Sequence, residues 1–100
     1  MNHPTTAPTN LKEVRQAIDA IDGELITLLA KRQYFVEQAG LLKPKNDAVA
    51  VADPERVSQV IADRRSKAEH AGLSPDVAEA VWRSMIDAFI RLELGVNQDK

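Results

Sequence analysis

The sequence feature that most constrains the fold is an apolar repeat that runs through residues 11–43. Its apolar residues recur at alternating steps of three and four, which is the spacing of one face of an α-helix. They are Leu11, Val14, Ile18, Ile21, Leu25, Leu28, Phe35, Ala39 and Leu42. The pattern predicts a single helix, which at about 1.5 Å per residue would be about 50 Å long.

A helix of this length is more than the rest of the chain can cover. The chain has 100 residues, and a compact domain of that size has a radius of gyration of only about 13 Å. We therefore expect a second copy of the chain to cover part of the apolar face, in a symmetric dimer.

One position of the apolar repeat carries a charge. Arg32 stands where the next apolar residue after Leu28 is due. A guanidinium is costly to bury without an anionic partner. Two interpretations are open: a salt bridge with an acid such as Glu93 or Asp22 of a neighbouring molecule, or a binding site for an anionic ligand.

Two further helices are predicted after the first. Pro44 ends the long helix, and residues 44–52 show no helical period and are expected to form a loop. Asp53 and Ser74 are each followed by proline, the pattern of an N-cap before the first helical residue. These signals predict helices that end at Gly72 and Gly95. The predicted fold is all-α, with one domain over residues 10–95, a flexible N-terminal tail at 1–9 and a polar C-terminal tail at 96–100.

Composition argues against several classes of function. The chain has no cysteine and no histidine pair at metal-ligand spacing, so we expect no metal site. It has no glycine-rich phosphate loop and no nucleophile motif. A net charge of −2 with four aromatic residues does not favour nucleic acid. With no recognisable signal peptide and no membrane-spanning run, we expect a cytoplasmic protein with no membrane partner and no cofactor.

Four cations are placed unusually. Lys43 lies at the mouth of the predicted loop, about three helical turns beyond Arg32 and on nearly the same face. Arg56 lies in the first turn of its helix, where the helix dipole disfavours a cation, and Arg15 flanks the apolar face. Each has an ordinary interpretation as a helix-end or surface charge. Together they could form a pocket for a small dicarboxylate, because arginine binds carboxylates with two hydrogen bonds.

Several of these residues lie in a familiar pattern. The run VRQAIDAIDGELITLLAKR, followed by Lys43, DPERV and a third helix that ends near Glu93, resembles the all-helical (type II) chorismate mutase family, which includes the isochorismate-pyruvate lyases. The resemblance covers about residues 10–95. It implies an intertwined homodimer with two equivalent active sites. Each site would take Arg15 from one subunit and four residues from the other: Arg32, Lys43, Arg56 and Glu93.

The resemblance also implies a substrate and a reaction. The family's substrate is a dicarboxylate enol ether, whose carboxylates Arg15 and Arg32 would hold. Lys43 would donate to the ether oxygen, and Asp53 would contact substrate hydroxyls. A mutase rearranges chorismate to prephenate in aromatic amino acid biosynthesis, without a cofactor, through positioning and electrostatic stabilisation.

Three positions depart from the mutase pattern. Val57 stands where mutases usually have glutamate and resembles the lyases, which eliminate pyruvate from isochorismate and leave salicylate in siderophore-type pathways. Phe89 stands where mutases often carry a small polar residue. Glu93 replaces a glutamine, and we expect it to work as a neutral acid, because a carboxylate cannot donate to an ether oxygen. The expected function is chorismate mutase, with isochorismate-pyruvate lyase as the alternative and a non-catalytic helical dimerisation module as the third possibility.

Overall fold

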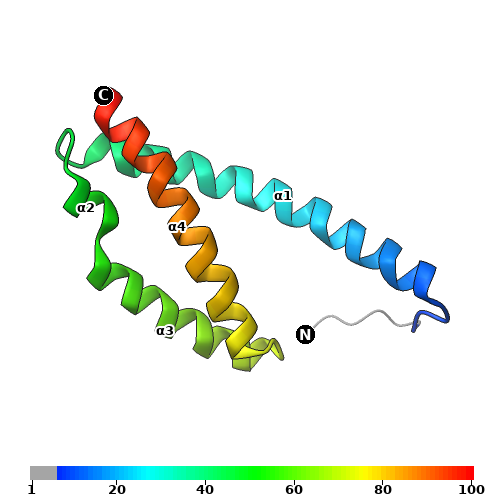
Figure 1. Ribbon diagram of the computed structural model, residues 1–100. Helices are drawn as coiled ribbons and strands as arrows, with labels where there is room; N and C mark the ends of the chain where they lie inside the picture. Colours follow the sequence, from blue (N-terminus) through cyan, green and yellow to red (C-terminus); the bar gives the residue numbers. More distant parts are fainter. Residues whose placement is uncertain (1–6) are drawn as a thin grey trace. The chain divides into compact units, whose positions relative to one another are not determined.

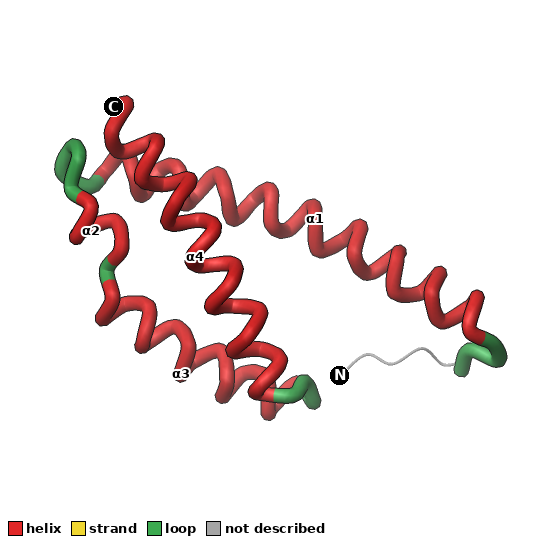
Figure 2. Tube along the Cα trace, viewed as in Figure 1, coloured by secondary structure: helices red, strands yellow, loops and turns green. Residues whose placement is uncertain are grey.

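The computed structural model describes residues 7–100, and these residues form helices and connecting turns without strands (Figures 1 and 2). The helices are α1 (Leu11–Leu42), α2 (Ala48–Ala52), α3 (Pro54–Ala71) and α4 (Pro75–Asp99). The all-α prediction is thus confirmed for the described residues. Of the predicted flexible tail at 1–9, residues 1–6 lie outside the part of the chain that the structure describes.

The chain divides into two compact units. The first ends at Tyr34, and the second runs from Phe35 to Lys100. The long helix predicted from the apolar repeat is present as α1, whose 32 residues extend through the boundary without interruption. Each unit is described below by itself.

The first unit contains the start of α1, which is capped by Asn10 and Glu13. The side chain of Asn10 accepts a hydrogen bond from the Glu13 backbone N–H at 2.9 Å. Glu13 in return accepts from the Thr9 backbone N–H at 2.7 Å. The two bonds satisfy donors at the helix start that would otherwise have no partner within the helix.

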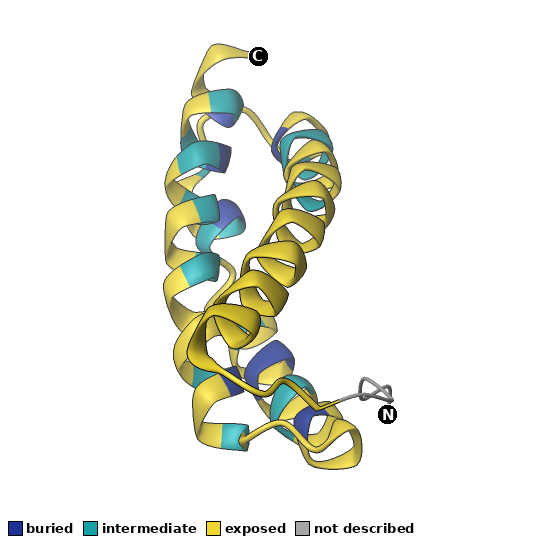
Figure 3. Ribbon diagram, turned by 90° about the vertical axis from the view of Figure 1, so that its right-hand side faces the viewer, coloured by how far each residue is buried: buried dark blue, intermediate teal, exposed yellow. Residues whose placement is uncertain are grey.

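The apolar repeat of the first unit is exposed. Residues 11–31 are all solvent-exposed in the single chain, as the colouring of α1 in Figure 3 shows. The six apolar residues of the repeat keep between 36% and 59% of their surface accessible. They are Leu11, Val14, Ile18, Ile21, Leu25 and Leu28. An apolar stripe of this kind is typical of a surface that another molecule covers, and the expected dimer stays a prediction.

The second unit has a small core between α3, α4 and α2. Val60 and Ile61 of α3 are buried, and they are joined by Ala78 of α4 and Val51 of α2. Figure 1 shows α4 following α3 after a short turn. Burial of these side chains supplies the main driving force for packing this unit.

The turn between α3 and α4 is specified by local sequence. Gly72 has a positive φ of 77°, which glycine adopts without steric cost. The backbone N–H of Gly72 donates to Glu69, and that of Leu73 donates to Ala68. This pair of bonds is the Schellman arrangement that ends many helices. Ser74 then caps α4 by accepting from the Val77 backbone N–H, as its position before a proline predicts.

Two predictions about the second unit were wrong. Residues 48–52 form the short helix α2 rather than a loop, and Asp47 caps this helix. The sequence did not predict it because five residues are too few to show a helical period. The polar C-terminal residues do not form a tail: α4 continues through Gly95 to Asp99, and Asn97 is buried. Gly95 lowers helix propensity, but the contacts of Asn97 hold the helix beyond it.

The last turns of α1 approach α4 closely at Gly40. A Cβ atom at this position would lie 3.1 Å from Cγ of Glu93, 3.2 Å from its carbonyl oxygen and 3.3 Å from Cγ1 of Val96. The contact with a backbone carbonyl is the important one, because it cannot be relieved by a rotamer change. Gly40 therefore lets the two helices meet at the level of Glu93.

We predict opposite effects for alanine at two helical glycines. Gly95→Ala should raise the free energy of unfolding by up to about 1 kcal/mol, since no atom lies within 4 Å of the added Cβ. Gly40→Ala should be less stable than Gly95→Ala by about 1–3 kcal/mol, because it overpacks the helix contact. Urea unfolding at one protein concentration measures both. Equal stabilisation by the two substitutions would contradict the close approach.

Candidate functional site

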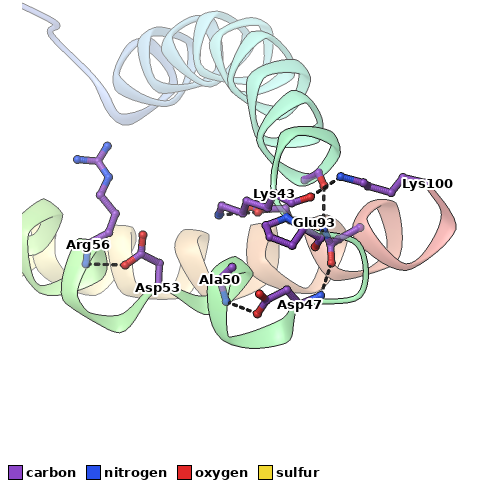
Figure 4. A network of polar contacts seen from close by, with 10 residues as sticks. Lys43, Asp47, Ala50, Asp53, Arg56, Glu93 and Lys100 are labelled. Carbon is purple, nitrogen blue, oxygen red and sulfur yellow. Dashed lines mark hydrogen bonds and ion pairs between the residues drawn. The ribbon is translucent and has the colours of Figure 1, made fainter.

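The centre of the candidate site is an ion pair between Lys43 and Glu93. Lys43 Nζ donates to Glu93 Oε2 at 2.7 Å, and the two side chains point toward one another in Figure 4. The Glu93 side chain is 8% exposed and that of Lys43 28%. A pair so far out of water requires close geometry, because desolvation otherwise outweighs the Coulomb attraction. The structure thus brings together two of the residues that the resemblance assigns to one site.

Lys43 is placed by the end of α1 and the turn that follows it. Its backbone N–H donates to Ala39 at 3.0 Å, so the helical hydrogen-bond pattern persists up to Lys43. Asn46 then has a positive φ of 56°, a conformation that asparagine tolerates better than most residues. Asp47 accepts from the Ala50 backbone N–H at 2.9 Å and starts α2 (Figure 4).

The side chain of Asn97 binds the backbone on both sides of Lys43. It is 1% exposed. Its Nδ2 donates to the carbonyl oxygens of Gly40 and Pro44, each at 2.9 Å. Its Oδ1 accepts from the backbone N–H of Asp47 at 2.8 Å. The end of α1 and the start of α2 are therefore both attached to one side chain of α4.

The side chain of Lys100, which follows α4, also binds the backbone at the end of α1. Its Nζ donates to the carbonyl oxygen of Leu41 at 2.6 Å and also to that of Lys43 (Figure 4). These carbonyls lie at the end of α1, where they lack partners within the helix and where the dipole favours a cation. Asn97 and Lys100 were not predicted as site residues, because residues 96–100 were expected to form a tail. Their spacing from Glu93, four and seven residues, is the signal that places all three on one helix face.

Three other predicted site residues lie where α2 is followed by α3: Asp53 caps α3, and Arg56 and Val57 lie in its first turn. Asp53 has a positive φ of 39°, and its side chain caps α3 by accepting from the Arg56 backbone N–H at 3.2 Å (Figure 4). Its predicted capping role is confirmed. Arg56 is exposed, and Val57 is half-buried. Their contacts with a substrate stay predictions.

The remaining predicted residues are Phe89, Arg15 and Arg32. Phe89 is half-buried on α4, one turn before Glu93. Arg15 and Arg32 belong to the first unit, where Arg15 is exposed and Arg32 half-buried. Glu93, which the sequence offered as one partner for Arg32, accepts from Lys43. The roles of the two arginines stay predictions.

Within residues 7–100, no group of three or more histidine, aspartate and glutamate side chains could hold a metal ion. Over the same residues, no helix is both long and apolar enough to cross a membrane. What the site offers chemically is a cation and a carboxyl group that meet in a place with little access to water. Such a pair is suited to donating hydrogen bonds and to stabilising charge on a bound molecule.

Comparison with known proteins identifies the family. Residues 14–94 match the sequence profile of the family described as chorismate mutase type II. The T-protein of Haemophilus influenzae is 42% identical over 73 residues, which are 73% of this chain and 19% of that protein. The isochorismate pyruvate lyase of Pseudomonas aeruginosa is 32% identical over 82 residues, which are 82% of this chain and 79% of the lyase.

A third relative is the bifunctional chorismate mutase/prephenate dehydratase of Aquifex aeolicus. It is 33% identical over an alignment of 86 positions, which covers 83% of this chain and 24% of that protein. The chain spans about a fifth of the length of the T-proteins that it matches, and most of the length of the lyase. The family profile covers both Lys43 and Glu93. The chain belongs to the chorismate mutase type II family.

Proposed function

We propose that this protein is a chorismate mutase, which rearranges chorismate to prephenate in aromatic amino acid biosynthesis. The observation that carries the proposal is the meeting of Lys43 and Glu93 at 2.7 Å, from two different helical elements and mostly out of water. Two groups aimed at one point can stabilise the charge that grows on an ether oxygen as its bond breaks. The mutase activity in the name of the Aquifex relative supports the proposal.

The proposed reaction needs no covalent intermediate. The C–C bond forms as the ether C–O bond breaks within one molecule, so the enzyme contributes positioning and charge stabilisation. Lys43 donates one hydrogen bond to the ether oxygen, and Glu93 donates a second. Glu93 accepts from Lys43 in the free protein. The ether oxygen must therefore replace the carboxylate beside Lys43, and Glu93 must carry a proton in order to donate.

The rest of the proposed site holds the substrate's other groups. Arg32 of one subunit and Arg15 of its partner bind the two carboxylates, because arginine binds a carboxylate with two hydrogen bonds. A homodimer is supported by the exposed apolar repeat of α1, which a second copy would cover. The remaining contacts come from the second unit, namely Asp53, Arg56, Val57 and Phe89.

A second candidate function is isochorismate-pyruvate lyase. It is favoured by Val57, which is apolar and half-buried where a mutase would usually present a glutamate. The Pseudomonas lyase also matches over most of its own length. In this reaction pyruvate is eliminated from isochorismate, and salicylate remains. The same Lys43 would then donate to the oxygen of the departing pyruvate.

Assays of the purified protein on each substrate separate these functions. With chorismate we expect prephenate, at a kcat/KM at least about tenfold above that for isochorismate. The products to follow are prephenate from one reaction and salicylate with pyruvate from the other. A higher kcat/KM for isochorismate would replace the mutase with the lyase. Turnover of neither would contradict both and leave a non-catalytic helical dimer.

The donor role of Glu93 makes a further prediction about substitutions. Because an amide donates a hydrogen bond as a neutral acid does, Glu93→Gln should keep turnover of chorismate. Glu93→Leu has no donor and should lower kcat by about a hundredfold, as measured by the formation of prephenate. Glu69→Leu, the same change at an exposed position of α3, should leave kcat unchanged. An equal loss of turnover in Glu93→Gln and Glu93→Leu would contradict the proposed role of Glu93.

A further inference from the structure

We infer that Asn97 is a positioning residue for the reaction: it holds the backbone around Lys43 so that the ammonium group faces the reacting oxygen. This inference rests on the proposed function, because Asn97 is argued to act through Lys43. Asn97 lies outside the motif that carries the family resemblance, within residues 96–100 that the sequence predicted to be a tail.

The hydrogen bonds of Asn97 specify how its amide is oriented. Both N–H donors meet carbonyl oxygens, of Gly40 and Pro44, and the amide oxygen meets the Asp47 N–H. Exchange of the amide nitrogen and oxygen would place an oxygen against two carbonyls. At 1% exposure, water cannot replace these partners. The side chain is therefore held in one orientation, and its three partners are held with it.

These partners enclose Lys43 along the chain. Gly40 lies three residues before Lys43, and Pro44 and Asp47 lie one and four residues after it. The backbone N–H of Asn46 also donates to the Asn97 carbonyl oxygen at 3.3 Å. The backbone of Lys43 cannot shift without breaking at least one of these bonds.

Helix α4 positions both partners of the ion pair. Glu93 and Asn97 are four residues apart on α4 and so lie on the same face. Glu93 binds the side chain of Lys43 at 2.7 Å, while Asn97 binds the backbone beside it. The position of the ammonium relative to the carboxyl group thus follows from the geometry of α4 rather than from a flexible loop.

The test compares Asn97→Asp with Gln98→Glu. Asn97→Asp keeps the side-chain shape but replaces the donor nitrogen with an oxygen that faces two carbonyls. Misplacing Lys43 should lower kcat by about tenfold to a hundredfold. KM should change less, because the substrate carboxylates are held elsewhere. Gln98→Glu makes the same amide-to-acid change at an exposed neighbour and should leave kcat and KM unchanged. A lower melting temperature of Asn97→Asp with wild-type kcat would overturn the inference.

A double variant shows whether Asn97 acts through Lys43. In a Lys43→Ala background, Asn97→Asp should lower the residual kcat less than about threefold, because the group that it positions is already gone. An equally large loss in both backgrounds would assign the effect to general destabilisation and would overturn the inference.

Amide hydrogen exchange separates failure of the inference from failure of the proposed function. The backbone N–H of Asp47, which donates to Asn97 Oδ1, should exchange at least about tenfold faster in Asn97→Ala, which has no side-chain acceptor, than in Gln98→Glu. This holds whether or not the protein turns over either substrate. Unchanged exchange in Asn97→Ala would overturn the positioning role even if catalysis is confirmed.

Discussion

A mostly buried ion pair between the end of α1 and α4 is the interaction on which the candidate site depends. A carboxylate as little exposed as that of Glu93 is stable only beside a cation, and Lys43 provides it at 2.7 Å. The pair also limits the fold, because α1 must end where Lys43 can reach α4. Gly40 makes this possible by letting the helices approach, and Pro44 ends α1 just beyond the pair.

The same pair explains how a chain without a nucleophile motif can be proposed as an enzyme. An ammonium and a carboxyl group that satisfy each other in the free protein are already largely out of water. At 2.7 Å they leave no room for another oxygen, so they must separate as the ether oxygen of the proposed substrate binds. In the proposed reaction Glu93 must also carry a proton in order to donate.

Much of the fold follows from local sequence. Asp53, Gly72 and Ser74 act as helix caps where the sequence predicts them, because capping depends on a few neighbouring residues. The apolar repeat predicted α1 to its last residue, Leu42. The family resemblance placed Lys43 and Glu93 in one site, which periodicity alone could not do, but their ion pair was not predicted.

Part of the fold could not be predicted from local sequence because it depends on contacts between distant residues. The sequence predicted that the last helix ends at Gly95. Helix α4 continues beyond it because the Asn97 side chain donates hydrogen bonds to the carbonyl oxygens of Gly40 and Pro44, more than fifty residues earlier. Helix α2 was missed because five residues carry no detectable period. The substrate contacts of Arg15 and Arg32 come from the resemblance and stay predictions, since they involve a substrate and, for Arg15, a second copy of the chain.

That the site is shared between two subunits is tested most directly by mixing two impaired variants. Arg15→Ala and Lys43→Ala subunits, each with only residual activity alone, are unfolded together in equal amounts and refolded so that the dimers pair at random. Mixed dimers are then half of the total, and each has one intact site of two, so about a quarter of the wild-type activity should return. No recovery, from subunits that are shown to form mixed dimers, would contradict a site that joins Arg15 of one subunit to Lys43 of the other.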